Sequence, residues 1–371
     1  MKLLLIDPTL PHPGEAAKIR AFAGIGDIDL TVLTGNVQRD GTREVRIEQS
    51  NIEDVNLHIG RVTGKFPNRT IFLTELVKCL QKRPDVILAY SDTDHLLTLQ
   101  IALTKGIITP KSKLIVQAWE NQQKSMKSHP QANVLLYVLD SFLEKTVITI
   151  ADGIAARNPE AREILTNRNL NIPVKVIPWA VDTDLFQERE EKSSEKFTVV
   201  YVGRLDRAKG IMDILKAVKD LHDVRVIIIG EGPYRKQLEG FAVDNRLDCT
   251  FTGSVDQPKL PDVLRGTDLF ILPSRTTGRW AEQFGRAAVE AMAMDIPVIG
   301  SDSGSIPWVI GDPELIFKEG DISELREKIC RFVADHSYYQ AKSQYCLKRA
   351  REEFNWIRHA QTAVDFCREI A

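Results

Sequence analysis

The chain has 371 residues, of which 43% are hydrophobic and 27% are charged, a balance typical of a globular protein large enough for two domains. Its 49 basic and 51 acidic residues give a net charge of −2, which excludes a global electrostatic attraction to nucleic acid. The sequence shows neither the pattern of a signal peptide nor an apolar run of ~18 residues, so we expect a cytoplasmic protein.

The first half of the chain reads as alternating strands and helices. Short apolar runs rich in β-branched residues are separated by helical patterns, which is typical of parallel βαβ units. Because helices cover both faces of such a sheet, its strands are apolar throughout instead of alternating. The predicted strands of this half cover residues 2–6, 29–34, 85–90, 113–117 and 174–178.

The second half repeats this pattern after a seam at residues 177–186. Residues 187–196 are charged and polar, which predicts an exposed linker. The fold class is therefore α/β, with two doubly wound, Rossmann-like domains. The predicted strands of this half cover residues 197–202, 224–229, 268–272 and 297–300, and the closing helices cover 322–334, 338–354 and 357–370.

Metal and redox chemistry have little support in the sequence. Five cysteines are scattered without a CxxC pair, which argues against a zinc site or a disulfide framework. Two acidic triplets, Asp92-Thr93-Asp94 and Asp182-Thr183-Asp184, have the spacing of a metal-binding motif, but such triplets are common by chance. We therefore predict that the protein uses no metal and no cofactor.

A glycine and two cations follow the predicted strand at 197–202. Gly203, Arg204 and Lys209 come after the carboxyl end of this strand, where ligands bind in open α/β sheets. A glycine lets the backbone approach a ligand, and the two cations have the charge to clamp a diphosphate. The alternative is a basic loop that does no more than begin a helix.

A second group of candidates follows the predicted strand at 268–272. Glu282 and Gln283 precede a helix rich in Ala and Met, whose free N–H groups favour an anion. Glu290 lies further along this otherwise apolar helix, so its carboxylate requires partners. The five residues from Gly285 to Glu290 span ~7.5 Å, which suits an anion at the helix end and a ribose diol beyond it.

These residues resemble the EX7E signature of the retaining GT-B glycosyltransferases of family 4. Glu282 and Glu290 are separated by seven residues, as in that signature. The resemblance is dense from residue 174 onward and implies the GT-B fold, in which two Rossmann-like domains face a central cleft. The other matching segments are residues 203–210, the turn 230–233, residues 251–255 and the seam at 176–186.

The resemblance implies a role for each candidate in the second domain. Arg204 and Lys209 hold the donor diphosphate and Glu282 takes the donor sugar, so these three are the implied catalytic residues. Glu290 takes the ribose hydroxyls. The remaining implied donor-binding positions, which include a strand end that meets the base, are Gly203, Gly253, Val255, Gln283, Phe284 and Gly285.

The seam and the resemblance together define three parts of the chain. Residues 1–180 are expected to form the acceptor-side domain, and residues 181–355 the domain that binds the nucleotide sugar. Residues 356–371 are expected to form a closing helix that packs back on the first domain.

The acceptor side departs from the pattern of the family. Many relatives have a His near the reacting centre, where this chain has Trp119 and Glu120, and the usual glycine pair after the first strand is reduced to Gly14. Some relatives also read Trp-Glu-Asn at this place, so the departure indicates a subgroup. We take Gly14, Trp119 and Glu120 as the acceptor-side candidates.

The implied activity is transfer of a hexose, with retention, from a nucleotide-diphosphate sugar to an acceptor hydroxyl. UDP-glucose is the expected donor, and a saccharide or polyprenyl-linked saccharide of surface polysaccharide biosynthesis is the expected acceptor. Three alternatives stay open. They are a GT-B nucleotide-sugar epimerase, a glycoside hydrolase with two carboxylates, and a sugar-nucleotide-binding partner subunit without turnover.

Two basic stretches lie in the first domain. Residues 105–129 contain five lysines and one acid, or +4, and residues 60–69 carry +3. One interpretation is a solvated lysine-rich surface. The other is peripheral docking on an anionic inner leaflet, at ~1 kcal/mol per basic residue near the surface, which would bring the protein to a polyprenyl-linked acceptor.

Overall fold

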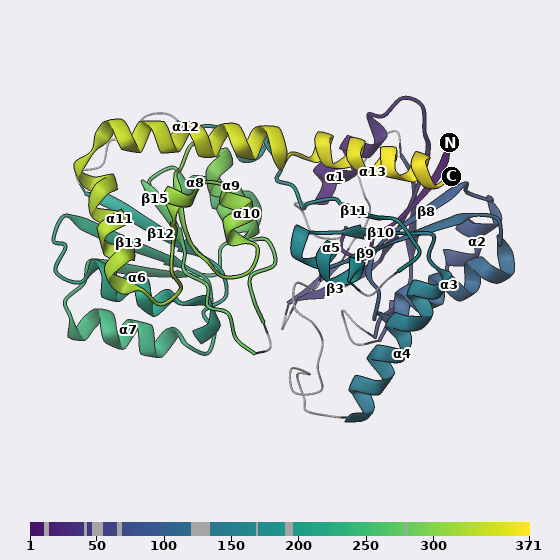
Figure 1. Ribbon diagram of the computed structural model, residues 1–371, viewed down its shortest axis with the longest axis horizontal. Coiled ribbons are helices and arrows are strands. Elements are labelled where there is room, and N and C mark those ends of the chain that lie inside the picture. Colours follow the sequence, from purple (N-terminus) through teal and green to yellow (C-terminus); the bar gives the residue numbers. More distant parts are fainter. Residues whose placement is uncertain are drawn as a thin grey trace. The chain divides into compact units, whose positions relative to one another are not determined.

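The protein divides into two compact units (Figure 1). The first joins Met1–Pro178 with Trp356–Ala371, and the second is the continuous segment Trp179–Asn355. The chain therefore leaves the first unit once and returns to it for its last helix. The structure is a computed structural model that describes residues 1–10, 15–40, 43–46, 55–64, 69–119, 134–167, 170–189, 196–278 and 280–371.

A seven-stranded parallel sheet forms the centre of the first unit. Its order is β11-β10-β9-β8-β1-β2-β5, and every neighbouring pair is parallel. β1 lies inside the sheet, with Leu3 in register with Leu30 on one side and Val86 on the other. The strands are β1 (Lys2–Ile6), β2 (Asp29–Gly35), β5 (Asn56–Gly60), β8 (Val86–Asp92), β9 (Lys113–Ala118), β10 (Gly153–Ala156) and β11 (Val174–Val176).

Helices cover both faces of this sheet, so the strands are buried on two sides. Leu4 and Ile6 of β1 enter one apolar core with α2–α5, whereas Leu3 and Leu5 enter the other with α1 and α13. These helices are α1 (Ala16–Ala23), α2 (Leu76–Gln81), α3 (Leu96–Ile108), α4 (Val134–Ile150), α5 (Pro159–Thr166) and α13 (Trp356–Ile370). Two antiparallel pairs complete the unit: β3 (Val37–Asp40) with β4 (Arg43–Arg46), and β6 (Val62–Thr63) with β7 (Ile71–Phe72).

The second unit has a six-stranded parallel sheet of order β14-β13-β12-β15-β16-β17. Its strands are β12 (Phe197–Val202), β13 (Val224–Ile229), β14 (Cys249–Gly253), β15 (Leu269–Leu272), β16 (Val298–Ser301) and β17 (Ile316–Phe317). The helical segments are α6 (Ile211–Val218), α7 (Arg235–Asp244), α8 (Leu260–Leu264), α9 (Arg286–Ala293), α10 (Ile306–Ile310), α11 (Ile322–Ala334), α12 (His336–Glu353), η2 (Arg207–Lys209), η3 (Gln257–Lys259) and η4 (Pro313–Leu315).

Local sequence explains where the long closing helices begin. The side chain of Asp321 accepts a hydrogen bond from the N–H of Glu324 at the start of α11, and Asp335 does the same for Tyr338 in α12. Such caps satisfy N–H groups that the helix itself leaves without a partner. The predicted fold class, α/β with parallel doubly wound sheets, is confirmed. None of the helices in the described ranges combines the length and apolar character needed to cross a bilayer.

Candidate functional site

The order of the second sheet has a switch point between β12 and β15, where open α/β sheets form a crevice outside the strand ends. These two strands are neighbours, with β13 and β14 on one side and β16 and β17 on the other. The chain therefore departs in opposite directions from their carboxyl ends. Such a switch point is where open α/β sheets bind their ligands, and it brings together the two groups of residues that the sequence singled out.

Glycines allow the two loops to approach each other. Gly210 has φ +66°, and a Cβ added there would lie 1.8 Å from the carbonyl oxygen of Pro273. Gly203 has φ +153°, and a Cβ there would lie 2.7 Å from the Tyr201 hydroxyl. That hydroxyl donates to the carbonyl of Arg204 at 3.1 Å. Burial raises the pKa of Tyr201 well above its ordinary value, so the phenol stays neutral and keeps this bond.

An ion pair between exposed Arg275 and buried Asp213 connects the same loops. The Arg275 guanidinium donates to both carboxylate oxygens of Asp213 at 2.8 and 2.6 Å, and the Arg275 N–H donates to the carbonyl of Ala208 at 2.7 Å. Asp213 is buried in the first turn of α6, and its hydrogen bonds raise the pKa of Arg275. The two parallel hydrogen bonds fix the orientation of the guanidinium and strengthen the contact.

Lys209 and Glu282 meet in this crevice. The Lys209 Nζ lies 2.8 Å from Glu282 Oε2, and the hydroxyl of Ser274 donates to the same oxygen at 2.8 Å. The ammonium also lies 4.2 Å from the centre of the Trp280 ring, within the range of a cation–π contact. Glu282 is buried, whereas the Lys209 side chain is 24% exposed. The Lys209 ammonium is therefore partly accessible to solvent, while the carboxylate of Glu282 beside it is buried and held by Ser274.

Arg204 is placed differently from Lys209. Its guanidinium pairs with Asp206 at 2.6 Å, and its side chain is 71% exposed. The two cations after β12 are thus one oriented group and one solvent-exposed group. Among the described residues of the second loop, Glu282 and Trp280 contact Lys209.

The segment before α9 contains three of the implied donor-binding positions, Gln283, Phe284 and Gly285. Gly285 is the N-cap of α9 with φ +78°, a conformation that favours glycine. The Phe284 ring packs against Phe354 at 5.4 Å between ring centroids and against Trp308 at 6.5 Å. A donor contact at Phe284 would therefore use its backbone, whereas Gln283 keeps a half-buried side chain.

Glu290 is buried one turn further along α9. Its Oε1 accepts a hydrogen bond from the Gln257 side-chain amide at 2.7 Å and lies 3.6 Å from Arg286 Nε. The sequence argument that this carboxylate requires partners is met by these contacts. Nearby, Gly253 ends β14 with φ +77° and its carbonyl accepts from the Gly230 N–H at 2.8 Å. Val255 follows in a half-buried loop position.

The acceptor-side candidates lie in the first unit. The indole N–H of Trp119 donates to Gln117 at 2.7 Å, and the Arg157 guanidinium stacks on the Trp119 ring at 3.7 Å. Gly14 and Glu120 lie outside the described residues. Trp119 is therefore the one acceptor-side candidate with a described environment.

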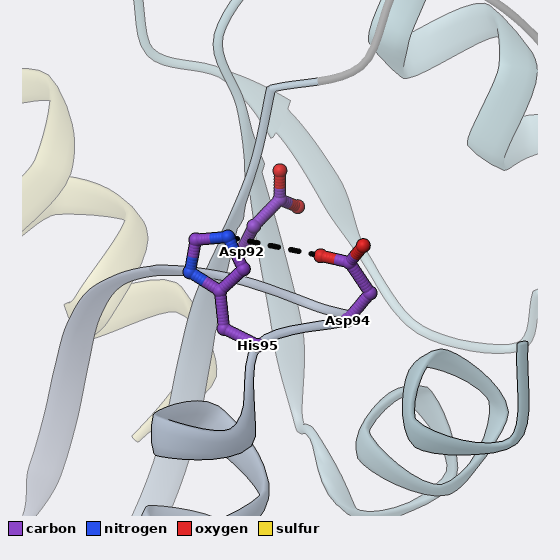
Figure 2. Close-up of side chains that lie close together, drawn as sticks. All are labelled: Asp92, Asp94 and His95. Carbon is purple, nitrogen blue, oxygen red and sulfur yellow. Dashed lines mark ion pairs between the residues drawn. The ribbon is translucent and has the colours of Figure 1, made fainter. Parts of the chain in front are cut away.

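Figure 2 shows the acidic triplet at the end of β8. Asp92, Asp94 and His95 place one potential ligand atom each within 4.8 Å of one another. His95 Nε2 lies 3.8 Å from Asp94 Oδ1, while Asp92 Oδ1 accepts from the Thr93 N–H at 2.8 Å. These contacts account for the proximity of the three groups, so we assign no metal here.

Several residues that contact the candidate site residues were not predicted from the sequence. Ser274 and Trp280 belong to the segment after β15, and their position after a strand end was the signal that could have indicated them. Gln257 had no such signal, because its partner Glu290 is 33 residues away. The Asp213 and Arg275 pair is equally non-local, spanning 62 residues.

Solved structures place this two-unit architecture in the GT-B class. Sucrose-phosphate synthase from Thermosynechococcus elongatus aligns over 100% of this chain and 99% of its own, with a TM-score of 0.70 and 19% identity. HepE from Anabaena, in complex with UDP, aligns over 100% of both chains with a TM-score of 0.69 and 17% identity. At such identities the likeness shows the fold alone, and it confirms the predicted GT-B fold.

Sequence comparison relates the second unit to known glycosyltransferases. Residues 182–353 match the family model described as glycosyl transferases group 1, and the predicted resemblance to glycosyltransferases is confirmed. TuaC of Bacillus subtilis, named as a teichuronic acid biosynthesis glycosyltransferase, is 30% identical over 193 residues. The alignment covers 46% of this chain and 46% of TuaC, so it spans less than half of each protein.

Proposed function

We propose that this protein is a retaining hexosyltransferase that uses a nucleotide-diphosphate sugar. The observation that carries the proposal is the pair of Lys209 and Glu282, 2.8 Å apart at the switch point of the unit that matches the glycosyl transferases group 1 model. The Lys209 ammonium is suited to the donor diphosphate. Glu282, held by Ser274, is suited to the hydroxyls of the donor sugar.

The proposed reaction exchanges one bond at the anomeric carbon for another. The bond from C1 to the diphosphate oxygen breaks, the acceptor oxygen bonds to C1 on the same face, and the acceptor proton passes to the departing phosphate. Negative charge grows on that phosphate in the transition state. Lys209, Arg204 and the N–H groups at the start of α9 are the groups proposed to stabilise it. No metal enters this scheme, so EDTA is expected to leave turnover unchanged.

UDP-glucose is the proposed donor. HepE, whose fold this chain shares, has been solved in complex with UDP-glucose. We expect UDP to raise the melting temperature of this protein and GDP to leave it unchanged, because the loop after β14 would accept one base and not the other. Stabilisation by GDP alone would overturn the choice of donor while leaving the transferase proposal in place.

The proposed acceptor is a saccharide or a polyprenyl-linked saccharide of surface polysaccharide biosynthesis. The name of TuaC, which refers to teichuronic acid biosynthesis, supports a surface-polymer role. An acceptor screen read by mass spectrometry of the product tests this directly. A mass gain of one hexose on a lipid-linked saccharide, and on no free monosaccharide, is the expected result.

The alternatives predict other products. An epimerase would convert UDP-glucose to an epimer without acceptor, and a glycoside hydrolase would cleave glycosides without needing a nucleotide. A partner subunit would bind the nucleotide and give no turnover across the whole acceptor panel. Without acceptor, the proposed transferase gives no epimer and at most slow donor hydrolysis, which separates it from the epimerase. Transfer product on an acceptor separates it from the partner subunit, and its need for the nucleotide sugar separates it from the glycoside hydrolase.

A further inference from the structure

Trp280 lies against the cation on which the proposed donor site depends. The Lys209 Nζ is 4.2 Å from the centre of the Trp280 ring and 2.8 Å from Glu282 Oε2. The ring offers an apolar surface with a negative π face, whereas the carboxylate carries a full charge. The ammonium is therefore confined by two neighbours of different chemistry.

Hydrogen bonds of the backbone hold Trp280 in this position. The N–H of Thr277 donates to the carbonyl of Trp280 at 2.8 Å, and the Thr277 hydroxyl donates to the same carbonyl at 3.2 Å. The two residues pair as an isolated antiparallel bridge. Since Glu282 follows Trp280 by two positions, this bridge places the ring and the carboxylate on the same stretch of chain.

The residues before the bridge are tied to the neighbouring strand end. The hydroxyl of Ser301, the last residue of β16, donates to the carbonyl of Ser274 at 2.5 Å. The hydroxyls of Thr276 and Ser303 lie 2.9 Å apart, and the three serines are fully buried. These bonds anchor the segment that leads to Trp280 in the interior of the second unit.

A restrained lysine binds an anion better than a freely rotating one. A lysine side chain loses rotamer freedom when its ammonium meets an anion, and this loss lowers affinity. A ring and a carboxylate that restrict Lys209 beforehand reduce the cost. The ammonium has three N–H donors, so its bond to Glu282 leaves it with donors for phosphate oxygens.

We propose that Trp280 is a positioning residue that orients the Lys209 ammonium toward the diphosphate of the donor. Its ring restricts the lysine side chain and keeps water from one side of the cation. The attraction between the cation and an incoming phosphate is thereby strengthened. The inference rests on the proposed function, because that function assigns the diphosphate to Lys209.

Calorimetry of the full chain with UDP measures the role of the ring. Trp280→Leu should weaken UDP binding about fivefold, the usual range for the loss of a cation–π contact at a partly exposed site. Trp280→Phe keeps an aromatic face and should weaken it only about twofold. Leu and Phe are both apolar, so a difference between the two variants reports the π face.

A double-mutant cycle with Lys209 separates positioning from support of the fold. In a Lys209→Ala background, Trp280→Leu should cause no further loss of UDP affinity, because the ring then has no ammonium to orient. A ring that only supported the loop around Glu282 would cause the same loss with or without the lysine.

Tyr338→Leu is the matched control for removal of a ring that contacts a cation. The Arg331 guanidinium lies 3.7 Å from the centre of the Tyr338 ring, in a contact between α11 and α12 of the same unit. This substitution should leave UDP affinity unchanged. All variants are expected to keep a cooperative thermal transition, and the cycle is run with Trp280→Phe if Trp280→Leu does not fold.

Two outcomes would overturn the role of Trp280. One is a UDP affinity that neither Trp280 variant changes, and the other is an equal loss in the wild-type and Lys209→Ala backgrounds. A wild-type chain that binds neither UDP nor GDP would instead overturn the proposed function. Binding of GDP alone would change the choice of donor, and the same variants would then be measured with GDP.

Discussion

The two units share one strand order and differ in what occupies its switch point. In the second unit β12 lies between β13 and β15, and in the first unit β1 lies between β2 and β8. The second unit keeps Lys209 and Arg204 in reach of solvent at this place. In the first unit Lys18 and Asp7 are fully buried and paired with each other.

The buried charges of the first unit are paired with one another. Lys18 also pairs with Glu15 at 2.7 Å and lies 4.7 Å from the centre of the Tyr90 ring. The Tyr90 hydroxyl lies 2.5 Å from His359 Nε2, and His359 Nδ1 donates to the Pro178 carbonyl at 2.6 Å. Of the segment between β1 and α1, the structure describes residues 7–10 and residue 15.

The comparison separates topology from chemistry. The shared strand order gives each sheet a switch point where two loops diverge. The side chains on these loops decide whether the charges there stabilise the fold or remain accessible to a ligand. In the second unit, Lys209 and Arg204 are paired with carboxylates but stay in reach of solvent, where an anion can meet them. In the first unit, the described charges satisfy each other. Four experiments test this contrast.

The largest effect is expected in the first unit. Lys18→Met leaves the buried carboxylates of Asp7 and Glu15 without their cation, which should lower the free energy of unfolding by about 3–5 kcal/mol. Urea denaturation measures the loss, and UDP affinity of the folded fraction should not change. The control is Lys2→Met at an exposed position of β1. Equal stability of both variants would show that the buried network is not structural.

The second largest effect is expected on the rate of transfer, from a substitution in the second unit. Lys209→Ala should reduce the rate of transfer about 10²–10³-fold, the cost of losing one group that stabilises developing negative charge. Stability should fall by less than in Lys18→Met, because Ser274 still donates to Glu282 and the Lys209 side chain is partly exposed. Lys216→Ala, at an exposed position of α6, is the matched control. Undiminished transfer in Lys209→Ala would refute the proposed role.

The pH dependence of stability should report on His359. Burial lowers its pKa from 6.5 to about 3, so the unfolded chain binds a proton between these values and the folded chain does not. Stability is then complete above about pH 6.5 and falls as pH decreases toward 3, at up to about 1.4 kcal/mol per pH unit. His359→Gln should flatten this slope in urea titrations at pH 4–7. An unchanged slope would mean that other groups cause the acid sensitivity.

The smallest effect is expected at Glu290. Gln257→Leu removes the amide that holds its carboxylate at 2.7 Å, which should weaken UDP binding about fivefold, the usual range for one hydrogen bond. The loss should disappear with 2′-deoxy-UDP if Glu290 contacts the ribose 2′-hydroxyl. Calorimetry with both nucleotides measures the difference. An equal loss for both would place the role of Gln257 outside ribose recognition.

The regular elements were predictable because their patterns are local. The predicted strand at 2–6 and the helix at 322–334 have the bounds of β1 and α11, since continuous apolar runs and capping residues act over a few positions. β10 escaped prediction because Gly153–Ala156 contains Gly and two Ala residues, which have low strand propensity. β5, with Asn56 and His58, escaped for a similar reason.

The sequence allowed the two groups of site residues to be predicted, but not the contacts between them. Both groups follow strands, so their place at one sheet edge could be inferred, but the contact between Lys209 and Glu282 depends on β12 and β15 being neighbours. No pattern along the chain encodes that order. The sequence pattern likewise predicted the same role for Arg204 and Lys209. In the structure, Arg204 pairs with Asp206 and is exposed.

The return of α13 to the first unit has a consequence for synthesis. Ala360, Val364 and Phe366 of α13 share a core with Leu3 and Leu5 of β1, so segments on either side of the second unit meet in one interior. A ribosome synthesises the whole continuous second unit between these two segments. The first unit therefore keeps an open apolar face until residue 366 has emerged, which exposes it to aggregation for longer than the continuous second unit.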